Sequence, residues 1–287
     1  MAESKSDAAD PVASMMLHGR VAIVTGGAGG IGSALCKHLA SLGARVAVGY
    51  IGDPAPALDL VTSINNSSHA GESNGHRPPR AIAVEADVSD AAQVKALFDA
   101  AAAAFGGGGE LHILVTLAAV LDFSYPSLAD MSEASYDATF GTNARGTFLC
   151  CREAANRLVR DGRGRIVTFS SSGVGSLRPG YTAYAASKAG VEVMTKILAR
   201  ELRGTGITAN AVAPGPTATP IFYTGKTEEE AQRYIAEAPL GRVGMPEDIA
   251  PLVGFLVSDA GHWVNGQVLR CNGGSVAALR QTRPCPT

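Results

Sequence analysis

Tyr184 and Lys188 are the two residues whose types and spacing most directly allow chemistry. Side chains four residues apart on a helix lie on one face, so we expect the phenol and the ammonium side by side. A neighbouring cation favours the phenolate and lowers the pKa of a tyrosine from about 10. The same phenol can donate its proton to a carbonyl oxygen. The pair therefore predicts general acid–base catalysis at a carbonyl or hydroxyl group.

A serine precedes this tyrosine at the end of an expected strand. Ser171 stands 13 residues before the tyrosine and directly after a strand expected over 164–170, where its hydroxyl could bind the same oxygen. It belongs to the serine run 170–172, so either neighbouring serine is an alternative, with Ser171 preferred. Tyr181 is followed four residues later by Ala185 rather than by a lysine, so we expect it to form a wall of the substrate pocket.

A glycine-rich turn occupies residues 25–32, with five glycines in eight positions. It lies between an expected strand and an expected helix. Glycine permits positive φ and lets the backbone approach a pyrophosphate, while a helix N-terminus offers unpaired N–H groups and a positive dipole. A tight turn without a ligand is the alternative. In its strand–turn–helix context, the segment predicts a dinucleotide site.

Short apolar runs alternate with helical segments along most of the chain. Such runs are typical of central parallel strands, and their alternation with helices indicates stacked βαβ units. Right-handed crossovers then give an α/β fold with a doubly wound (Rossmann) parallel sheet of seven strands and helices on both faces. We expect strands over 20–26, 45–50, 81–86, 111–116, 164–170, 206–212 and 267–270. We expect helices over 33–43, 91–105, 142–159, 183–203, 227–236 and 247–257.

A single domain is expected over 19–276, because no linker divides it. Residues 1–18 are expected to form a disordered arm and 277–287 a C-terminal tail. A polar insertion over 67–80 is rich in Gly, Ser and Pro and is predicted to be a surface loop. The irregular segment 214–240 is typical of a lid over a substrate.

The composition excludes several classes of protein. Of the 287 residues, 46% are hydrophobic and 17% are charged, and the formal net charge is -2. Such a chain can bury a large core, so it is neither disordered nor collagen-like. It shows no basic stripe for nucleic acid, and no apolar run of about 18 residues for a membrane span.

The cysteines are few and scattered, at positions 36, 150, 151, 271 and 285, without a Cys-x-x-Cys spacing. No metal site is predicted, and His69 and His76 in the polar insertion are expected to be solvated. The first 16 residues contain acids and lack the apolar core of a secretory signal. Reduced thiols and the missing signal together predict a cytoplasmic protein.

The combined motifs resemble those of the short-chain dehydrogenase/reductase family. They are Thr-Gly-x3-Gly-x-Gly from Thr25, Asp87 in EADVSD, Asn143 in TNARG, Tyr184-x3-Lys188 and Pro214-Gly215. The similarity extends from about residue 20 to residue 276, and stretches such as CREAANRL, YAASKAG and ITANAVAPGP are similar to the plant NADPH-dependent aldehyde reductase-like members. The resemblance implies a nicotinamide cofactor that supplies hydride, while the protein supplies orientation and proton transfer.

The resemblance also implies roles for single residues. Asn143, Ser171, Tyr184 and Lys188 would be catalytic. Asn143 would hold a water that links Lys188 to solvent, and Asp87 would contact the adenine amino group. The implied cofactor site comprises Gly26, Gly30, Ile31, Gly32, Tyr50, Asp87, Val88, Ala118, Tyr184, Lys188, Pro214, Gly215 and Thr217.

The residue that selects the cofactor is expected at the end of the strand over 45–50. An acid about 20 residues beyond the glycine turn binds the ribose hydroxyls of NAD and repels the 2′-phosphate of NADP. Here that position is Tyr50, and the nearest acid, Asp53, is expected in the following turn. NADP(H) is therefore predicted as the preferred cofactor, with NAD(H) as the alternative.

The chain departs from the family at the end of the strand over 111–116. Where the family has Asn-Asn-Ala-Gly, this chain has Thr116, Leu117, Ala118 and Ala119. The changes remove an amide and add apolar bulk beside the cofactor. We interpret them as tuning of the pocket, because the Ser, Tyr and Lys set is intact.

The sequence therefore predicts an NADP-dependent oxidoreductase that reversibly reduces the carbonyl of an aldehyde, ketone or quinone. Residues 119–123 and 173–181, with Phe222 and Tyr223, are expected around the pocket mouth; they are mostly apolar or neutral, which disfavours a highly charged substrate. A nucleotide-sensing or structural protein on the same scaffold is the alternative. The expected partners are a small-molecule carbonyl or alcohol and, through the helices over 142–159 and 183–203, further copies in a homotetramer or homodimer.

Overall fold

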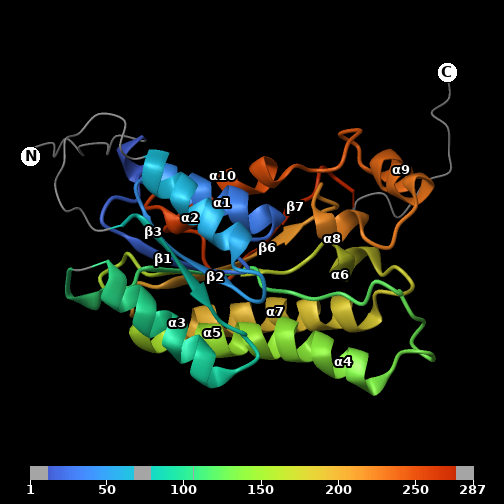
Figure 1. Cartoon of the computed structure of the whole chain (residues 1–287), viewed down its shortest axis with the longest axis horizontal. Helices are drawn as coiled ribbons and strands as arrows, with labels where there is room; N and C mark the ends of the chain where they lie inside the picture. Colours follow the sequence, from blue (N-terminus) through green and yellow to red (C-terminus); the bar gives the residue numbers. More distant parts are fainter. Residues whose placement is uncertain (1–11, 68–78, 106, 276–287) are drawn as a thin grey trace, which may run out of the picture.

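A parallel sheet forms the centre of the molecule (Figure 1). In the computed structural model, residues 12–67, 79–105 and 107–275 are described. The strands within these residues are β1 (Val21–Thr25), β2 (Arg45–Tyr50), β3 (Ala81–Glu85), β4 (Ile113–Thr116), β5 (Arg165–Phe169), β6 (Thr208–Pro214) and β7 (Val268–Cys271). Their order is β3-β2-β1-β4-β5-β6-β7, with every pair parallel. This order confirms the predicted doubly wound sheet.

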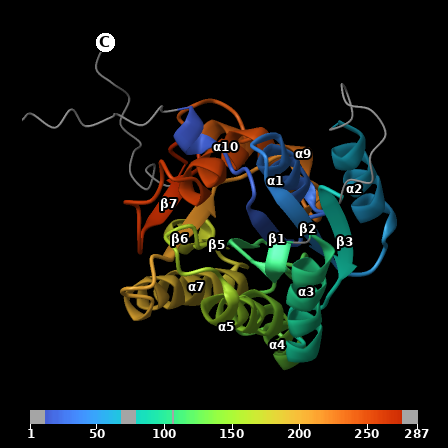
Figure 2. The ribbon, with the colours of Figure 1, turned by 90° about the vertical axis from the view of Figure 1, so that its left-hand side faces the viewer.

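Helices cover both faces of the sheet (Figure 2). One layer contains α1 (Gly30–Ser41), α2 (Ala55–Ser67) and α10 (Pro246–Val257). The other contains α3 (Ala91–Ala104), α5 (Thr147–Arg157) and α7 (Thr182–Glu201). Leu35 and Val253 of the first layer and Phe98 and Leu149 of the second are buried against opposite faces of the sheet. Because both faces are covered, the central strands are apolar without alternation.

The helix predicted over 142–159 begins earlier and is not uniform. It continues from α4 (Glu133–Phe140) through a π-helical segment, η3 (Gly141–Gly146), into α5. Ser132 is the N-cap of α4, since its side chain accepts a hydrogen bond from Ser135 N. α4 was not predicted, because its residues, EASYDATF, show little apolar periodicity.

The expectation of a disordered arm is wrong for residues 12–18. Ala13–Met15 form a 3-10 turn, and Leu17 is fully buried with its N–H donating to Leu42 O at 2.7 Å. The carbonyl of Ser14 accepts hydrogen bonds from two backbone N–H groups just beyond α10. This segment is ordered because Leu17 completes the core beside α1.

Three other predictions concern residues outside the described ranges: the rest of the arm, the C-terminal tail after residue 275, and most of the polar insertion with His69 and His76. In the part of the chain that the structure describes, no helix combines the length and hydropathy that a membrane span needs. The histidines, cysteines and acids of the same part do not gather in groups of three that could ligate a metal.

The irregular segment 214–240 carries α8 (Pro220–Tyr223) and α9 (Glu228–Glu237), on the right of Figure 1. The predicted helix over 227–236 corresponds to α9. Glu230 N donates to Thr227 Oγ1 at 3.2 Å, and the Glu230 carboxylate accepts from Thr227 N at 2.8 Å. This reciprocal cap fixes where α9 begins.

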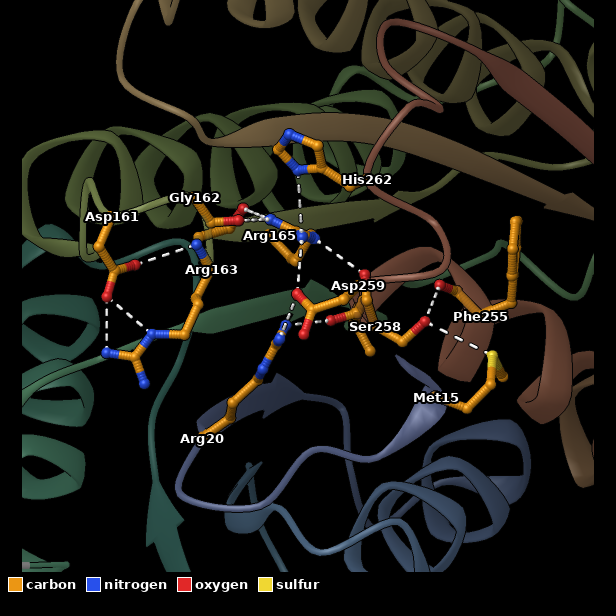
Figure 3. A network of polar contacts seen from close by, with 12 residues as sticks. Met15, Arg20, Asp161, Gly162, Arg163, Arg165, Phe255, Ser258, Asp259 and His262 are labelled. Carbon is orange, nitrogen blue, oxygen red and sulfur yellow. Dashed lines mark hydrogen bonds and ion pairs between the residues drawn. The ribbon is translucent and has the colours of Figure 1, made fainter. Parts of the chain in front are cut away.

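Two buried arginines lie at the amino edge of the sheet (Figure 3). Arg20, just before β1, donates to Val257 O at 2.9 Å and forms an ion pair with Asp259 at 2.5 Å. Arg165, at the start of β5, donates to three backbone carbonyls and lies 3.6 Å from the same carboxylate. Its Nη2 also lies 3.3 Å from His262 Nδ1. The two guanidiniums thus connect β1 and β5 to the segment that follows α10.

Candidate active site

The residues with predicted chemistry meet at the carboxyl edge of the sheet. A cleft of about 210 Å³ opens there between the strand ends, the start of α7 and the segment 214–240. The predicted residues that line it are Ile31, Ser171, Tyr184, Lys188, Pro214, Gly215 and Thr217. Open α/β sheets bind their ligands at this edge.

The glycine turn leaves bare backbone where side chains would not fit. A Cβ on Gly26, whose φ is +65°, would lie 2.8 Å from Ala118 N, and one on Gly32 would lie 2.2 Å from Gly26 O. α1 begins at Gly30, and its N-cap, Gly29, has no side chain to satisfy the first N–H groups. Because these donors are uncapped and approachable, the turn fits the pyrophosphate of a dinucleotide.

The residues predicted for the adenosine half follow β2 and β3 and are not among those that line the cleft. Asp87 Oδ1 accepts from Ser89 N and Ser89 Oγ, both at 2.8 Å, and Val88 is buried. Tyr50 is half-buried at the end of β2. Asp53 Oδ1 accepts a backbone N–H at the start of α2 at 2.9 Å, so this acid belongs to the turn, as predicted.

Ser171, Tyr184 and Lys188 come together from two elements. Ser171 follows β5, whereas Tyr184 and Lys188 lie on the first turns of α7. The Ser171 side chain lies near enough to the Tyr184 phenol to lower its pKa. Lys188 Nζ lies 5.8 Å from the centre of the Tyr184 ring and donates to Phe169 O at 2.9 Å. The arrangement places a phenol, a hydroxyl and an amine around one small volume.

The structure distinguishes the three serines of the run. Ser170 Oγ donates to Glu192 Oε1 at 2.7 Å, and Ser172 Oγ donates to Ala213 O at 3.3 Å. Ser171 Oγ instead accepts from Gly173 N at 3.0 Å and keeps its own proton available toward the phenol. The geometry therefore favours Ser171 over its neighbours. Glu192 lies two turns beyond Tyr184 on α7. The sequence did not single it out beside the site, because its partner Ser170 lies after β5, far away along the chain.

The pKa values of Tyr184 and Lys188 depart from the sequence-based expectation. Burial raises the pKa of Tyr184, and the Ser171 side chain opposes this rise. Burial lowers the pKa of Lys188 from 10.5 to about 8. The predicted lowering of the tyrosine pKa by the lysine is not seen, because burial has the largest effect on the pKa of each group. A raised pKa keeps the phenol protonated at neutral pH.

Asn143 lies in the π-helical segment η3 and is fully buried. Its side chain exchanges two hydrogen bonds with the backbone of Val120, accepting at 2.8 Å and donating at 3.0 Å. Nδ2 also lies 3.2 Å from Ser187 Oγ, whose hydroxyl donates to Tyr184 O at 2.7 Å. Asn143 thus ties the loop after β4 to the first turn of α7. Single π-helical turns of this kind frequently occur at functional sites.

The residues that depart from the family pattern shape one wall of the cleft. Leu117 and Ala119 line it, and Leu117 also packs against the core. Thr116 Oγ1 is buried and has no hydrogen-bond partner among the described residues. Ala118 N lies 3.4 Å from Thr25 Oγ1 and borders the glycine turn. The substitutions therefore make this wall more apolar.

The outer part of the cleft combines aromatic rings with two cations. Tyr181 lies 6.3 Å from Tyr184 between ring centres, consistent with a wall, and its hydroxyl is 3.2 Å from that of Tyr234. Arg178 and Lys226 both line the cleft, whose other lining residues are mostly apolar or neutral, as predicted. The two cations come from separate loops, and only the tertiary structure brings them to one opening.

Comparisons with known proteins agree with this geometry. Residues 26–275 match a family model described as "Enoyl-(Acyl carrier protein) reductase". The chain is 54% identical to an NADPH-dependent aldehyde reductase-like protein, chloroplastic, of Arabidopsis thaliana, over 91% of this chain and 95% of that protein. It is 48% identical to NADPH-dependent aldehyde reductase 2, chloroplastic, of the same plant, over 96% and 99%.

A solved structure supports the same assignment. A short chain dehydrogenase from Burkholderia cenocepacia J2315 in complex with NADP is 35% identical, with a TM-score of 0.79, and the alignment covers 90% of this chain and 98% of that one. The predicted cytoplasmic location is contradicted, because the names of both Arabidopsis relatives place them in the chloroplast. Reduced, scattered cysteines are compatible with either compartment and do not distinguish cytoplasm from plastid. From its motifs, fold and relatives, the chain belongs to the short-chain dehydrogenase/reductase family of oxidoreductases.

Proposed function

We propose that this protein is an NADPH-dependent reductase of aldehydes and related small carbonyl compounds. The observation that carries the proposal is the convergence of Ser171, Tyr184 and Lys188 in one cleft whose other wall adjoins the glycine turn. The names of the two Arabidopsis relatives support the aldehyde and the cofactor. They also support a location in the plastid.

In this proposal Tyr184 is the general acid. Its burial keeps the proton on the phenol until a carbonyl oxygen accepts it. Ser171 donates a hydrogen bond to the same oxygen and so orients it. The cofactor, when bound, supplies the hydride. Lys188 binds the ribose of the cofactor and, with Asn143, returns a proton to Tyr184 from solvent.

The proposed preference for NADPH depends on Tyr50, the last residue of β2. Tyr50 occupies the position from which an acid would repel the 2′-phosphate, and Asp53 is held in the next turn by a hydrogen bond to backbone. Gly26, Gly30, Ile31 and Gly32 would hold the pyrophosphate. The other predicted contacts, which lie along the same edge of the sheet, are Asp87, Val88, Ala118, Pro214, Gly215 and Thr217.

We further propose a homotetramer or homodimer assembled through α5 and α7. Phe148 on α5 and Val193 and Ile197 on α7 are large apolar side chains with about half of their surface exposed. A second copy would cover them, as isologous interfaces do. Sedimentation of a species of only 29.3 kDa at micromolar concentration would contradict this assembly.

The purified protein should consume NADPH when mixed with aldehydes and leave it unchanged without them. The assay follows the absorbance of the reduced cofactor across a panel of aldehydes, ketones and quinones. Calorimetry with NADP+ runs in parallel. Cofactor binding without turnover of any panel member would contradict the proposal and favour a nucleotide-sensing protein on this scaffold.

A further inference from the structure

Lys226 lies at the outer end of the cleft, between α8 and α9. Its Nζ donates to Tyr125 Oη at 2.6 Å. The centres of three rings surround the ammonium, Tyr125 at 4.8 Å, Phe222 at 5.3 Å and Tyr234 at 5.8 Å. Aromatic faces at these distances attract a cation and exclude water from part of its surface. The ammonium is therefore held in place by its surroundings.

The charge of Lys226 has no acidic partner beside it. Among the described residues, no carboxylate oxygen lies within 4.0 Å of its Nζ. Arg178, the neighbouring cation of the cleft, forms an ion pair with Glu237. Glu230, four residues after Lys226, directs its carboxylate to Thr227 N at 2.8 Å. Lys226 helps to lower the pKa of the nearby Glu230 but forms no ion pair with it, so the outer cleft keeps a positive charge.

A line of aromatic rings connects this charge to the proposed reaction centre. Tyr125 lies 5.2 Å from Tyr181 between ring centres, and Tyr181 lies 6.3 Å from Tyr184. Phe222 and Tyr234, 5.3 Å apart, continue this aromatic surface, and the Tyr181 and Tyr234 hydroxyls meet at 3.2 Å. A flat molecule whose carbonyl reaches Tyr184 would lie along these rings and present its far end to the ammonium.

We infer that the substrate is an aromatic or conjugated carbonyl compound with an anionic group opposite the carbonyl, and that Lys226 binds this group. The inference rests on the proposed function and specifies its substrate class. A hydrogen bond between an ammonium and a carboxylate is stronger than one between neutral groups. The aromatic surroundings strengthen it further by lowering the local dielectric.

Two matched pairs of substrates test this inference. They are 4-formylbenzoate with its methyl ester, and the longer 4-formylcinnamate with its methyl ester. In wild type, kcat/KM with NADPH should favour the acid over the ester about tenfold in at least one pair. Lys226→Gln removes the charge but keeps a donor for Tyr125, and the ratio should fall to near one. Arg233→Gln removes an exposed charge from α9 and should preserve the ratio.

Comparison of ratios between variants cancels the different intrinsic reactivities of acid and ester. Calorimetry of 4-formylcinnamate with the NADP+-loaded protein gives a readout without turnover, and Lys226→Gln should weaken this binding about tenfold. Equal acid-to-ester ratios in wild type and Lys226→Gln would overturn the inference alone. Absence of turnover with all four compounds and with every member of the panel used to test the proposed function would overturn that function together with the inference.

Discussion

Arg165 and Lys188 are buried cations at opposite edges of the same sheet, with different surroundings. At the amino edge, the Arg165 guanidinium donates to three backbone carbonyls, contacts His262 and lies 3.6 Å from Asp259 (Figure 3). At the carboxyl edge, Lys188 Nζ donates to Phe169 O and has no ion pair among the described residues. Burial lowers the pKa of Arg165 to about 10 and that of Lys188 to about 8.

This difference separates a stabilising network from a reactive site. The amino edge uses its donors to tie β1 and β5 to the segment after α10. At the carboxyl edge, hydrogen-bond donors remain available for a ligand. The pKa values of Tyr184 and Lys188 are shifted by burial, and shifted pKa values are typical of functional sites. Substitutions at the first edge should therefore reduce stability, and those at the second should change activity, proton binding or cofactor choice.

Tyr184→Phe should give the largest effect, on turnover alone. The change removes the proposed proton donor and nearly preserves shape, so kcat should fall by about 10²–10⁴-fold, while NADP+ affinity and Tm stay close to wild type. Steady-state kinetics, calorimetry and thermal unfolding measure these quantities. Tyr181→Phe, in the same cleft, is the matched control and should lose much less activity. A Tyr184→Phe enzyme within about threefold of wild-type kcat would exclude this tyrosine as the acid.

Arg165→Met, at the amino edge, should reduce stability and leave turnover unchanged. It leaves buried carbonyls without donors and separates β5 from Asp259, so the free energy of unfolding should fall by about 1–3 kcal/mol. Urea unfolding measures the loss, and kcat of the folded fraction should be unchanged. Arg163→Met, at a partly exposed ion pair with Asp161, is the control and should cost less than about 1 kcal/mol. Equal losses for both arginines would contradict a special role for the network.

Lys188→Met should stabilise the protein in a pH-dependent way. Because the folded pKa is about 8 and the unfolded one 10.5, the unfolded state binds more protons between these values, and wild-type stability rises with pH there. The folded state therefore carries a penalty of roughly 3 kcal/mol below pH 8, which the variant lacks. Its stability advantage in urea unfolding should be largest near pH 7 and should shrink as the pH approaches 10.5.

Lys196→Met, at an exposed lysine on the same helix, is the control for this experiment. Its free energy of unfolding is measured at each pH beside that of Lys188→Met. If the difference in unfolding free energy between Lys188→Met and wild type did not change with pH, the amine would not be desolvated in the folded state.

Tyr50→Asp should give the smallest effect, a change of cofactor preference. Wild type should favour NADPH over NADH about tenfold in kcat/KM, or about 1.4 kcal/mol. The introduced carboxylate repels the 2′-phosphate and accepts hydrogen bonds from ribose hydroxyls, so the preference should reverse. Asp53→Asn is the control and should leave the preference in place. Equal or better kinetics of wild type with NADH would refute the role of Tyr50.

The sequence by itself determined the positions of the strands, the position of the glycine turn and the pairing of Tyr184 with Lys188. These features depend on local periodicity and on spacing within one helix or one turn, which neighbouring residues control. The beginning of α9 at Thr227 is of the same kind, because its cap joins residues three apart.

Only the tertiary structure decided which serine faces Tyr184, because the partners of Ser170 and Ser172 lie on α7 and β6. The π-helical segment around Asn143 likewise depends on hydrogen bonds to the loop after β4. The direction of the Tyr184 pKa shift also followed from burial rather than from spacing. Contacts between distant segments control desolvation and hydrogen-bond partners, and a linear pattern of residue types does not contain them.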